Sequence, residues 1–294
     1  MAATSAELKI GIPKGSLEEA TIALFAKSGW KITMRARNYF PEVNDPELVT
    51  RLCRPQEIPR YVADGVLDAG LTGKDWTLEN QAKVQIVSDL IYSKTSARPA
   101  YWVLAVAGDS PYRKPEDLAG KRVATEITGL TERYFKAKNI PVKVEYSWGA
   151  TEAKVVEGLA DAIVEVTETG ATIRAHGLRV IDEVLVTNTQ FIACPAAWAD
   201  PWKRGKIEQI NLLLQGALKA EGLVGLKMNA KTADVQRIIA LLPSLNSPTV
   251  SGLRDADWHA LEVVVSVAVV RDLIPRLVEA GAEGIIEYPL NKVI

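Results

Sequence analysis

Cysteine and histidine are scarce in this sequence of 294 residues, which holds two of each. Two thiols are too few for a disulfide scaffold, and Cys53 and Cys194 both sit in apolar, strand-like runs, so we expect them buried and reduced. His176 and His259 lie far apart, and no H-x-x-x-H or C-x-x-C spacing occurs. These absences argue against a structural or hydrolytic zinc site.

Two nucleophile and cofactor motifs are also missing. No G-x-S-x-G nucleophile elbow occurs, and no G-x-G-x-x-G follows the first expected strand. The missing motifs argue against covalent catalysis by such a serine and against nicotinamide chemistry.

Long hydrophobic runs and an excess of charge are absent as well. The most apolar run, 263–270, is eight residues long, whereas a membrane span needs about 20, so we expect a buried strand there. The first residues show no secretory signal, and we expect a cytoplasmic protein without a membrane partner. With 35 basic and 36 acidic residues, a broad nucleic-acid-binding face is not expected, although an anion held at one point is compatible.

The first two thirds of the chain alternate β-branched runs with amphipathic stretches, which indicates parallel sheets covered by helices. The expected strands are 8–13, 48–53, 68–72, 84–91, 101–107, 122–125, 142–146, 162–166, 178–186 and 190–198. The expected helices are 15–29, 56–64, 129–138, 151–158, 171–176 and 206–220.

The C-terminal residues 222–294 follow a different order. Strand 223–228, helix 232–242, strands 248–253 and 258–268, helix 270–280 and strand 284–288 give the βαββαβ order of a ferredoxin-like (ACT-like) domain. We therefore predict an α/β protein with a two-lobed, periplasmic-binding-protein-like unit before this domain. Lobe I would comprise 1–95 with 180–221, and lobe II would comprise 96–179. A ligand should lie in the cleft between them, at the carboxyl ends of strands.

The segment 160–178 carries the strongest chemical signal. An apolar strand delivers Glu165, and a loop of small hydroxyl residues around Gly170 then leads into a helix. Backbone N–H groups at such a turn can hold a phosphate, and a carboxylate at the strand end suits the hydroxyls of a ribose. A turn capped by Thr169 without any ligand is the competing interpretation.

Two further segments could meet an anion. Lys14 and Ser16 stand at the end of the first strand, and the glycine-rich run 64–73 follows a helix. Arg51 and Arg54 flank this run and could face a polyphosphate. A plain helix cap, tight turns and exposed arginines without a role remain open alternatives.

Residues 165–173, E-V-T-E-T-G-A-T-I, resemble the phosphoribosyl diphosphate loop of the ATP phosphoribosyltransferases. The resemblance covers nearly the whole chain and includes these further stretches: G-L-A-D-A-I at 158–163, A-H-G-L at 175–178, K-G-S-L at 14–17, R-P-Q-E-I-P-R-Y-V-A-D-G-V-L-D-A-G-L-T-G at 54–73, R-V-A-T at 122–125, S-P-T at 247–249 and D-W at 257–258. The C-terminal part resembles the regulatory domain of the long form, which short forms lack.

This resemblance implies a reaction. N1 of the ATP adenine would displace diphosphate from C1 of phosphoribosyl diphosphate, the first step of L-histidine biosynthesis. Mg²⁺ would be held mainly by the substrate phosphates, with the protein ligands left open. Feedback inhibition by L-histidine, a homo-oligomer (dimer or hexamer) and no separate regulatory subunit are implied as well. The alternative is a non-catalytic two-lobed small-molecule binding protein.

The resemblance also implies site residues. Phosphoribosyl diphosphate would bind Glu165, Thr167, Glu168, Thr169, Gly170, Ala171 and Thr172. ATP would bind Lys14, Gly15, Ser16, Arg51, Arg54, Asp68, Gly70, Thr72 and Gly73, with Glu165, Lys14 and Arg54 as the catalytic residues. Ser247 and Thr249 are assigned to the inhibitory histidine. The chain departs from the family where members often carry Asp in place of Glu165, and where Glu168 puts a negative charge into a phosphate loop.

Overall fold

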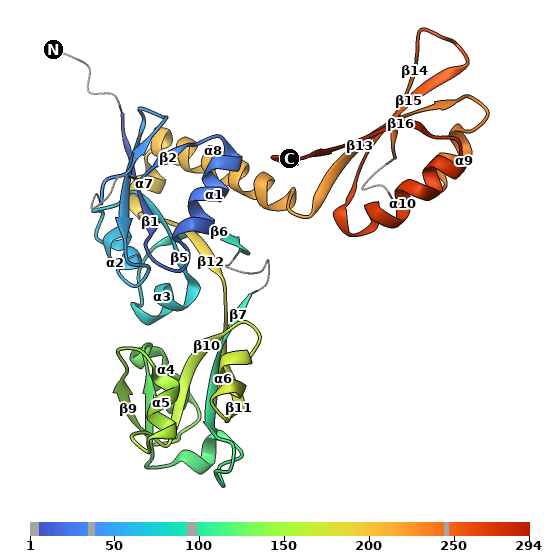
Figure 1. The fold of residues 1–294 in the computed structure, drawn as a ribbon. Helices are drawn as coiled ribbons and strands as arrows, with labels where there is room; N and C mark the ends of the chain where they lie inside the picture. Colours follow the sequence, from blue (N-terminus) through green and yellow to red (C-terminus); the bar gives the residue numbers. More distant parts are fainter. Residues whose placement is uncertain (1–5, 35–38, 93–98, 244–246) are drawn as a thin grey trace, which may run out of the picture. The chain divides into compact units, whose positions relative to one another are not determined.

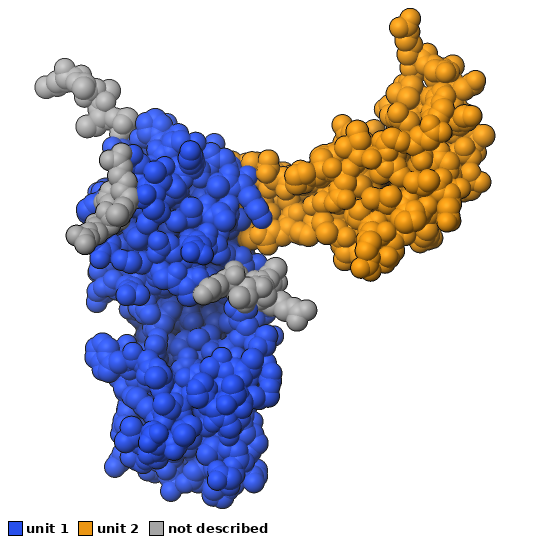
Figure 2. Space-filling view, viewed as in Figure 1, with its two compact units in different colours: residues 1–211 blue, residues 212–294 orange. Residues whose placement is uncertain are grey.

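The chain forms two compact units, Met1–Asn211 and Leu212–Ile294 (Figure 1 and Figure 2). The computed structural model describes residues 6–34, 39–92, 99–243 and 247–294. No helix among the described residues is long and apolar enough to cross a bilayer.

Lobe I of the first unit is built on a five-stranded sheet in the order β4-β1-β5-β12-β6. Its strands are β1 (Leu8–Pro13), β4 (Leu48–Cys53), β5 (Ala69–Gly73), β6 (Gln85–Leu90) and β12 (Thr189–Ala193). The alternation of apolar residues along β1 buries Leu8, Ile10 and Ile12 completely. Around the sheet lie α1 (Glu18–Ser28), α2 (Ile58–Ala63), α3 (Lys74–Glu79), α7 (Pro195–Ala199), α8 (Pro201–Lys219) and a ribbon of β2 (Ile32–Thr33) and β3 (Glu42–Val43).

Lobe II is built on a second five-stranded sheet, in the order β11-β7-β10-β8-β9. Its strands are β7 (Ala100–Ala107), β8 (Arg122–Thr125), β9 (Lys143–Tyr146), β10 (Ala162–Thr167) and β11 (Leu178–Thr187). Its helices are α4 (Thr128–Ala137), α5 (Thr151–Val156) and α6 (Ala171–Ala175), with a 3-10 turn over Pro115–Leu118. The chain crosses back to lobe I at Asn188, between β11 and β12.

The prediction of parallel sheets holds for only part of each sheet. β1 runs parallel to β4 and β5, and β10 and β9 run parallel to β8. β12 is antiparallel to β5 and β6, and β7 is antiparallel to β10 and β11. β7 and β12, the strands on which the chain enters each lobe, are therefore antiparallel to the parallel strands of that lobe's sheet. Local sequence patterns do not encode this arrangement.

The second unit contains the predicted βαββαβ order. Its elements are β13 (Leu223–Lys231), α9 (Val235–Ile239), β14 (Thr249–Gly252), β15 (Trp258–Ser266), α10 (Val267–Glu279) and β16 (Glu283–Pro289). The sheet order β14-β15-β13-β16 is that of a ferredoxin-like domain. Leu226, Met228, Ile238 and Leu277 lie at its core.

Three local predictions are wrong. The run 263–270 is not one strand, because the Ser266 hydroxyl accepts a hydrogen bond from the Ala268 N–H and begins α10. The expected strand 190–198 ends at Ala193, since Pro195 opens α7. Cys194 is buried as expected, but Cys53 is only half-buried, because β4 lies at the edge of its sheet. Both thiols are free.

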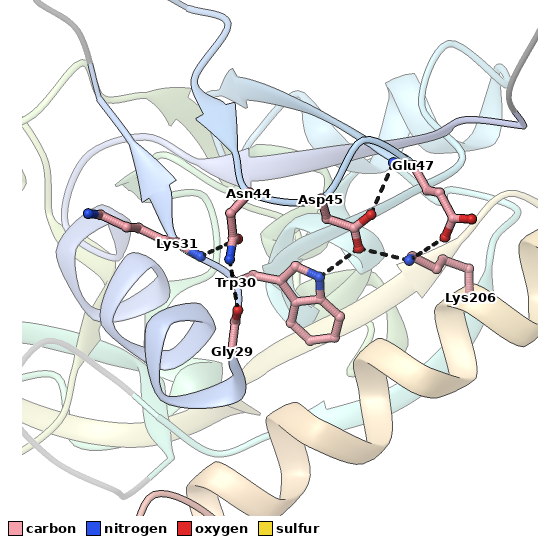
Figure 3. Close-up of polar contacts among 7 residues, drawn as sticks. All are labelled: Gly29, Trp30, Lys31, Asn44, Asp45, Glu47 and Lys206. Carbon is pink, nitrogen blue, oxygen red and sulfur yellow. Dashed lines mark hydrogen bonds and ion pairs between the residues drawn. The ribbon is translucent and has the colours of Figure 1, made fainter.

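The first half of α8 is tied to lobe I by a cluster of polar contacts (Figure 3). The Lys206 ammonium donates to Asp45 at 2.8 Å and to Glu47 at 2.7 Å, and the Trp30 indole N–H donates to Asp45 at 2.9 Å. Burial by itself would raise the pKa of Asp45, but the Lys206 ammonium and the Trp30 N–H bring it below its ordinary value. The Lys206 side chain is only 9% exposed, so losing its carboxylate partners would leave a buried charge uncompensated.

Candidate active site

A cavity of about 520 Å³ lies between the two lobes of the first unit. This volume is typical of small-molecule sites, which concentrate at such clefts in α/β proteins. Residues of lobe I, of lobe II and of the crossing segments line it, among them Ser16, Gln56, Gly73, Asp75, Trp76, Trp102, Glu126, Thr167, Glu168, Thr169, Thr172 and Asn188.

The predicted phosphate loop, 167–172, forms one wall of this cavity. It follows β10, the middle strand of its sheet, and turns into α6 at Gly170, whose φ of 70° is left-handed. The Thr167 hydroxyl accepts a hydrogen bond from the Gly170 N–H at 2.8 Å, and the Thr169 hydroxyl accepts one from the Ala171 N–H at 3.3 Å. The residue that caps α6 is therefore Gly170, not Thr169 as the competing interpretation had it.

Glu165 is half-buried behind this loop. Its carboxylate accepts a hydrogen bond from the Val166 N–H at 3.0 Å. The pKa of Glu165 is raised to about 7, chiefly by burial, while the Thr151 hydroxyl and the Val166 N–H oppose the rise and the charges of Glu152 and Glu126 add to it. The carboxylate thus changes its charge near neutral pH.

Replacing Glu165 by Gln is expected to stabilise the free protein at pH 8 and to change its stability little at pH 5. The folded-state pKa of about 7 exceeds the ordinary glutamate pKa of 4.5, so the folded chain binds the proton more tightly than the unfolded chain does. The stability gained from that proton is complete below the unfolded pKa and is lost as the pH rises through the folded one. Urea midpoints at both pH values measure the effect, with the exposed Glu132→Gln as control. An equal shift at both pH values would contradict the assignment.

The residues predicted to bind ATP are only partly brought into the cavity. Ser16 and Gly73 line it. The Lys14 ammonium lies 4.4 Å from the centre of the Tyr39 ring, and Arg51 stacks on Phe40 at 4.6 Å. Arg51 also donates to the Thr50 carbonyl. Among the described residues no ion pair joins either cation to an acidic side chain, so both can meet a polyphosphate.

Other members of the same predicted set have structural partners. The Asp68 carboxylate accepts hydrogen bonds from the Lys203 ammonium at 2.7 Å and from the Lys9 N–H at 2.8 Å. The Thr72 hydroxyl is buried and donates to the Pro55 carbonyl. A Cβ at Gly70 would lie 2.6 Å from the Ile58 side chain, so this glycine lets α2 pack on β5.

Gly15 and Arg54 are neighbours at the start of α1. A Cβ at Gly15 would lie 3.8 Å from the Arg54 guanidinium, and Gly15 has a φ of 109°. Neither residue lines the cavity, although Ser16, which follows Gly15 directly, does. Their assignment to ATP stays a prediction.

Several residues at the junction of the lobes escaped the sequence analysis. The buried Asp75 carboxylate accepts a hydrogen bond from the Trp102 indole N–H at 2.6 Å, and the Asp75 N–H donates to the Thr187 hydroxyl at 3.2 Å. Burial raises the pKa of Asp75, and the Trp102 N–H is the strongest of the hydrogen bonds that oppose this rise. The sequence patterns predicted no helix over Lys74–Glu79, and so Asp75 was not recognised as a candidate site residue.

A second set of contacts joins α3 to α4. The Glu79 carboxylate accepts hydrogen bonds from the Gly129 and Leu130 N–H groups at 2.9 and 2.7 Å, where α4 begins. The Arg133 guanidinium donates to the Leu78 carbonyl at 2.7 Å, where α3 ends. A carboxylate at a helix start and a cation at a helix end both match the helix dipole. These contacts join α3 of lobe I to α4 of lobe II and thereby fix how far apart the two lobes stand around the cavity.

The comparisons with known proteins agree with this geometry. The family model HisG: ATP phosphoribosyltransferase matches residues 54–216, and the model HisG, C-terminal domain, matches residues 220–292. The chain belongs to the ATP phosphoribosyltransferase family. It is therefore a transferase of the pentosyl class, and it serves the first step of histidine biosynthesis. The family match favours this enzyme over a non-catalytic binding protein and confirms the predicted fold class.

Individual relatives cover the whole length. The chain is 73% identical over 287 residues to the ATP phosphoribosyltransferase of Nitratidesulfovibrio vulgaris (strain Miyazaki F), covering 98% of both chains. It is 67% identical to that of Solidesulfovibrio magneticus, again over 98% of both chains. Among solved structures, an ATP phosphoribosyl transferase (HisG:HisZ) complex from Thermotoga maritima matches with a TM-score of 0.61 and 28% identity, covering 71% of this chain and 98% of that one.

Proposed function

We propose that this ATP phosphoribosyltransferase joins its substrates in the interlobe cavity. N1 of the ATP adenine attacks C1 of phosphoribosyl diphosphate, and diphosphate leaves. The observation that carries the proposal is that Thr167, Glu168, Thr169 and Thr172 of the lobe II loop line one cavity of ligand size together with Ser16 and Gly73 of lobe I. Each lobe thereby presents part of the residue set that the family resemblance assigned to one substrate.

The loop 167–172 would hold the 5-phosphate of the sugar. The Gly170 and Ala171 N–H groups, now satisfied by threonine hydroxyls, would donate to phosphate oxygens at the start of α6. Glu165 would accept hydrogen bonds from the ribose hydroxyls once it is ionised. Displacement at an anomeric carbon develops positive charge on the ring, which a nearby carboxylate stabilises without forming a covalent bond.

Lys14 and Arg54 would meet the phosphates from lobe I. Arg51 lies on β4, three residues before Arg54, which directly follows that strand. Positive groups here would stabilise both the ATP polyphosphate and the charge on the departing diphosphate. The enclosed cleft would exclude water, which would otherwise hydrolyse the sugar donor.

The family needs a divalent metal, and we infer that this metal is Mg²⁺ arriving on the diphosphate. The described residues contain no group of three or more His, Cys, Asp or Glu side chains arranged to hold a metal ion. Glu168 lines the cavity and offers the oxygen ligands that Mg²⁺ prefers. This donor set suits an ion bound mainly by substrate phosphates, where it would neutralise the leaving group.

Purified protein should convert ATP and phosphoribosyl diphosphate, with Mg²⁺, into phosphoribosyl-ATP and diphosphate. Mass spectrometry identifies the nucleotide product, and a coupled assay measures the diphosphate. Reactions without ATP report hydrolysis of the sugar donor alone, and excess chelator reports the metal requirement. No product above the enzyme-free background would contradict the proposed function.

Regulation is proposed for the second unit. L-Histidine would bind the ferredoxin-like domain and inhibit the enzyme, which we expect to act as a homo-oligomer (dimer or hexamer) in the cytoplasm without a separate regulatory subunit. Ser247 and Thr249, the residues assigned to this ligand, are exposed at the start of β14. The assay above, run with histidine on the whole chain and on a chain ending at Ala220, tests the proposal. Equal inhibition of both chains would show that the domain is not the histidine site.

A further inference from the structure

Glu126 carries a carboxylate in the cavity wall. It belongs neither to the residues proposed to bind phosphoribosyl diphosphate nor to those proposed to bind ATP. It directly follows β8, which runs parallel to β10 with Thr125 opposite Val164. Glu126 therefore lies beside Glu165 on the neighbouring strand, near the carboxyl ends of β8 and β10.

The surroundings of Glu126 leave its carboxylate available to a ligand. It is half-buried, and burial raises its pKa. In the part of the chain that the structure describes, no hydrogen bond or ion pair involves its side chain. Asp75, by contrast, also lines the cavity, but its carboxylate already accepts hydrogen bonds from the Trp102 indole N–H and from the Trp76 backbone N–H.

The reaction creates a charge that such a carboxylate can meet. When N1 uses its lone pair to bond C1, the adenine ring becomes positive, and the charge spreads to the adjacent 6-amino group. A carboxylate that accepts an N–H of this amino group binds it more strongly as the charge develops. Interactions that strengthen in this way lower the barrier instead of only tightening substrate binding.

We propose that Glu126 accepts a hydrogen bond from the 6-amino group of ATP and stabilises the positive charge that develops on the adenine. The inference rests on the proposed reaction in this cavity. The C1–O bond breaks and its electron pair leaves with the diphosphate, while the N1 lone pair forms the new bond. No proton has to move.

The position of Glu126 favours this role over a second contact to the sugar. Neighbouring strands are about 4.8 Å apart, so Glu126 stands beside the ribose site at the end of β10 without overlapping it. The opposite wall of the cavity carries Ser16 and Gln56 of lobe I, the side from which ATP would enter. An adenine facing C1 would then present its amino edge to the end of β8.

A double-mutant cycle between protein and substrate tests the contact. The wild type and Glu126→Ala are each assayed with ATP and with purine riboside triphosphate, which keeps N1 and lacks the 6-amino group. We expect Glu126→Ala to lower kcat/KM for ATP by about 10- to 100-fold, the range for a lost hydrogen bond to a charged group. For the analogue, the two proteins should differ by less than about threefold. The weaker nucleophilicity of the analogue cancels, because it affects both proteins equally.

Two measurements guard against an indirect effect. Glu132→Ala removes an exposed carboxylate of α4 outside the cavity and should leave both rates unchanged. Calorimetric Kd values for phosphoribosyl diphosphate with Mg²⁺ should agree between Glu126→Ala and wild type, which shows that the fold and the sugar site survive.

Each outcome decides the question. A loss confined to ATP supports the inference. Equal losses with both nucleotides would overturn it and assign Glu126 to the sugar, the metal or the fold, and no loss with ATP would overturn it as well. Failure of the wild type to form phosphoribosyl-ATP would instead remove the proposed function, and the inference with it.

Discussion

Replacing Gly170 by Val is expected to lower kcat/KM by about 100-fold or more. The valine side chain would occupy the proposed 5-phosphate site, which is built from backbone N–H groups. Gly170 has a φ of 70°, and a Cβ there would lie 2.8 Å from the Arg174 guanidinium. The added side chain would stand at the start of α6, where the 5-phosphate is proposed to sit. Steady-state kinetics with varied phosphoribosyl diphosphate measure the loss.

Gly177 provides a matched control for this variant. Its φ of 69° is nearly the same, and nothing lies within 4 Å of its Cβ position. It follows the C-terminal end of α6, whereas Gly170 precedes the N-terminal end, between Thr169 and Thr172 of the cavity wall. Val at either position carries the same kind of backbone strain, about 1–2 kcal/mol. Both variants should therefore lose similar stability, and only Gly170→Val should lose activity. Unchanged kinetics for Gly170→Val, or equal losses in both variants, would reject the phosphate-loop assignment.

Replacing Trp102 by Ala is expected to destabilise the first unit by about 3–5 kcal/mol, the range for removing a large buried aromatic side chain. Trp102 is 2% exposed and packs edge-on against Trp76, with ring centres 6.4 Å apart. Its loss opens a void where the lobes join and leaves the buried Asp75 carboxylate without its indole donor. Urea denaturation followed by far-UV circular dichroism measures the change.

Two companion variants separate packing from hydrogen bonding. Trp102→Phe keeps an aromatic ring and removes the N–H, so we expect a loss of about 1–3 kcal/mol for the unsatisfied carboxylate. Burial already raises the pKa of Asp75, and the missing donor would raise it further, so this loss should be larger at pH 8 than at pH 5. Trp148 is 90% exposed, and Trp148→Ala should change stability by less than about 0.5 kcal/mol. Equal effects at positions 102 and 148 would contradict the described junction.

Local patterns predicted most strands, because a strand that buries one or both faces shows alternating or consecutive apolar residues within a few positions. β1, β4 and β8 were predicted with their observed ends, since apolar and β-branched residues alternate or run together there. The short helices α3 and α7 were missed for local reasons: α3 follows β5 with no residue between them, and α7 lies within the apolar run that was expected to be the strand 190–198. At 263–270, β-branched residues continue through a helix start, and a single serine hydroxyl decides the change.

The same division holds for the candidate site. The sequence by itself determined the loop 167–172, because a glycine at a left-handed position and small hydroxyl residues act within a few residues of one another. Only the tertiary structure decided that Ser16, Asp75, Trp102 and Glu126 share a cavity with that loop. It also showed that Asp68, Thr72 and Gly70 have partners within lobe I. The physical reason is that a cleft is made by contacts between distant segments, whose pairing and direction depend on strand order and not on any local pattern.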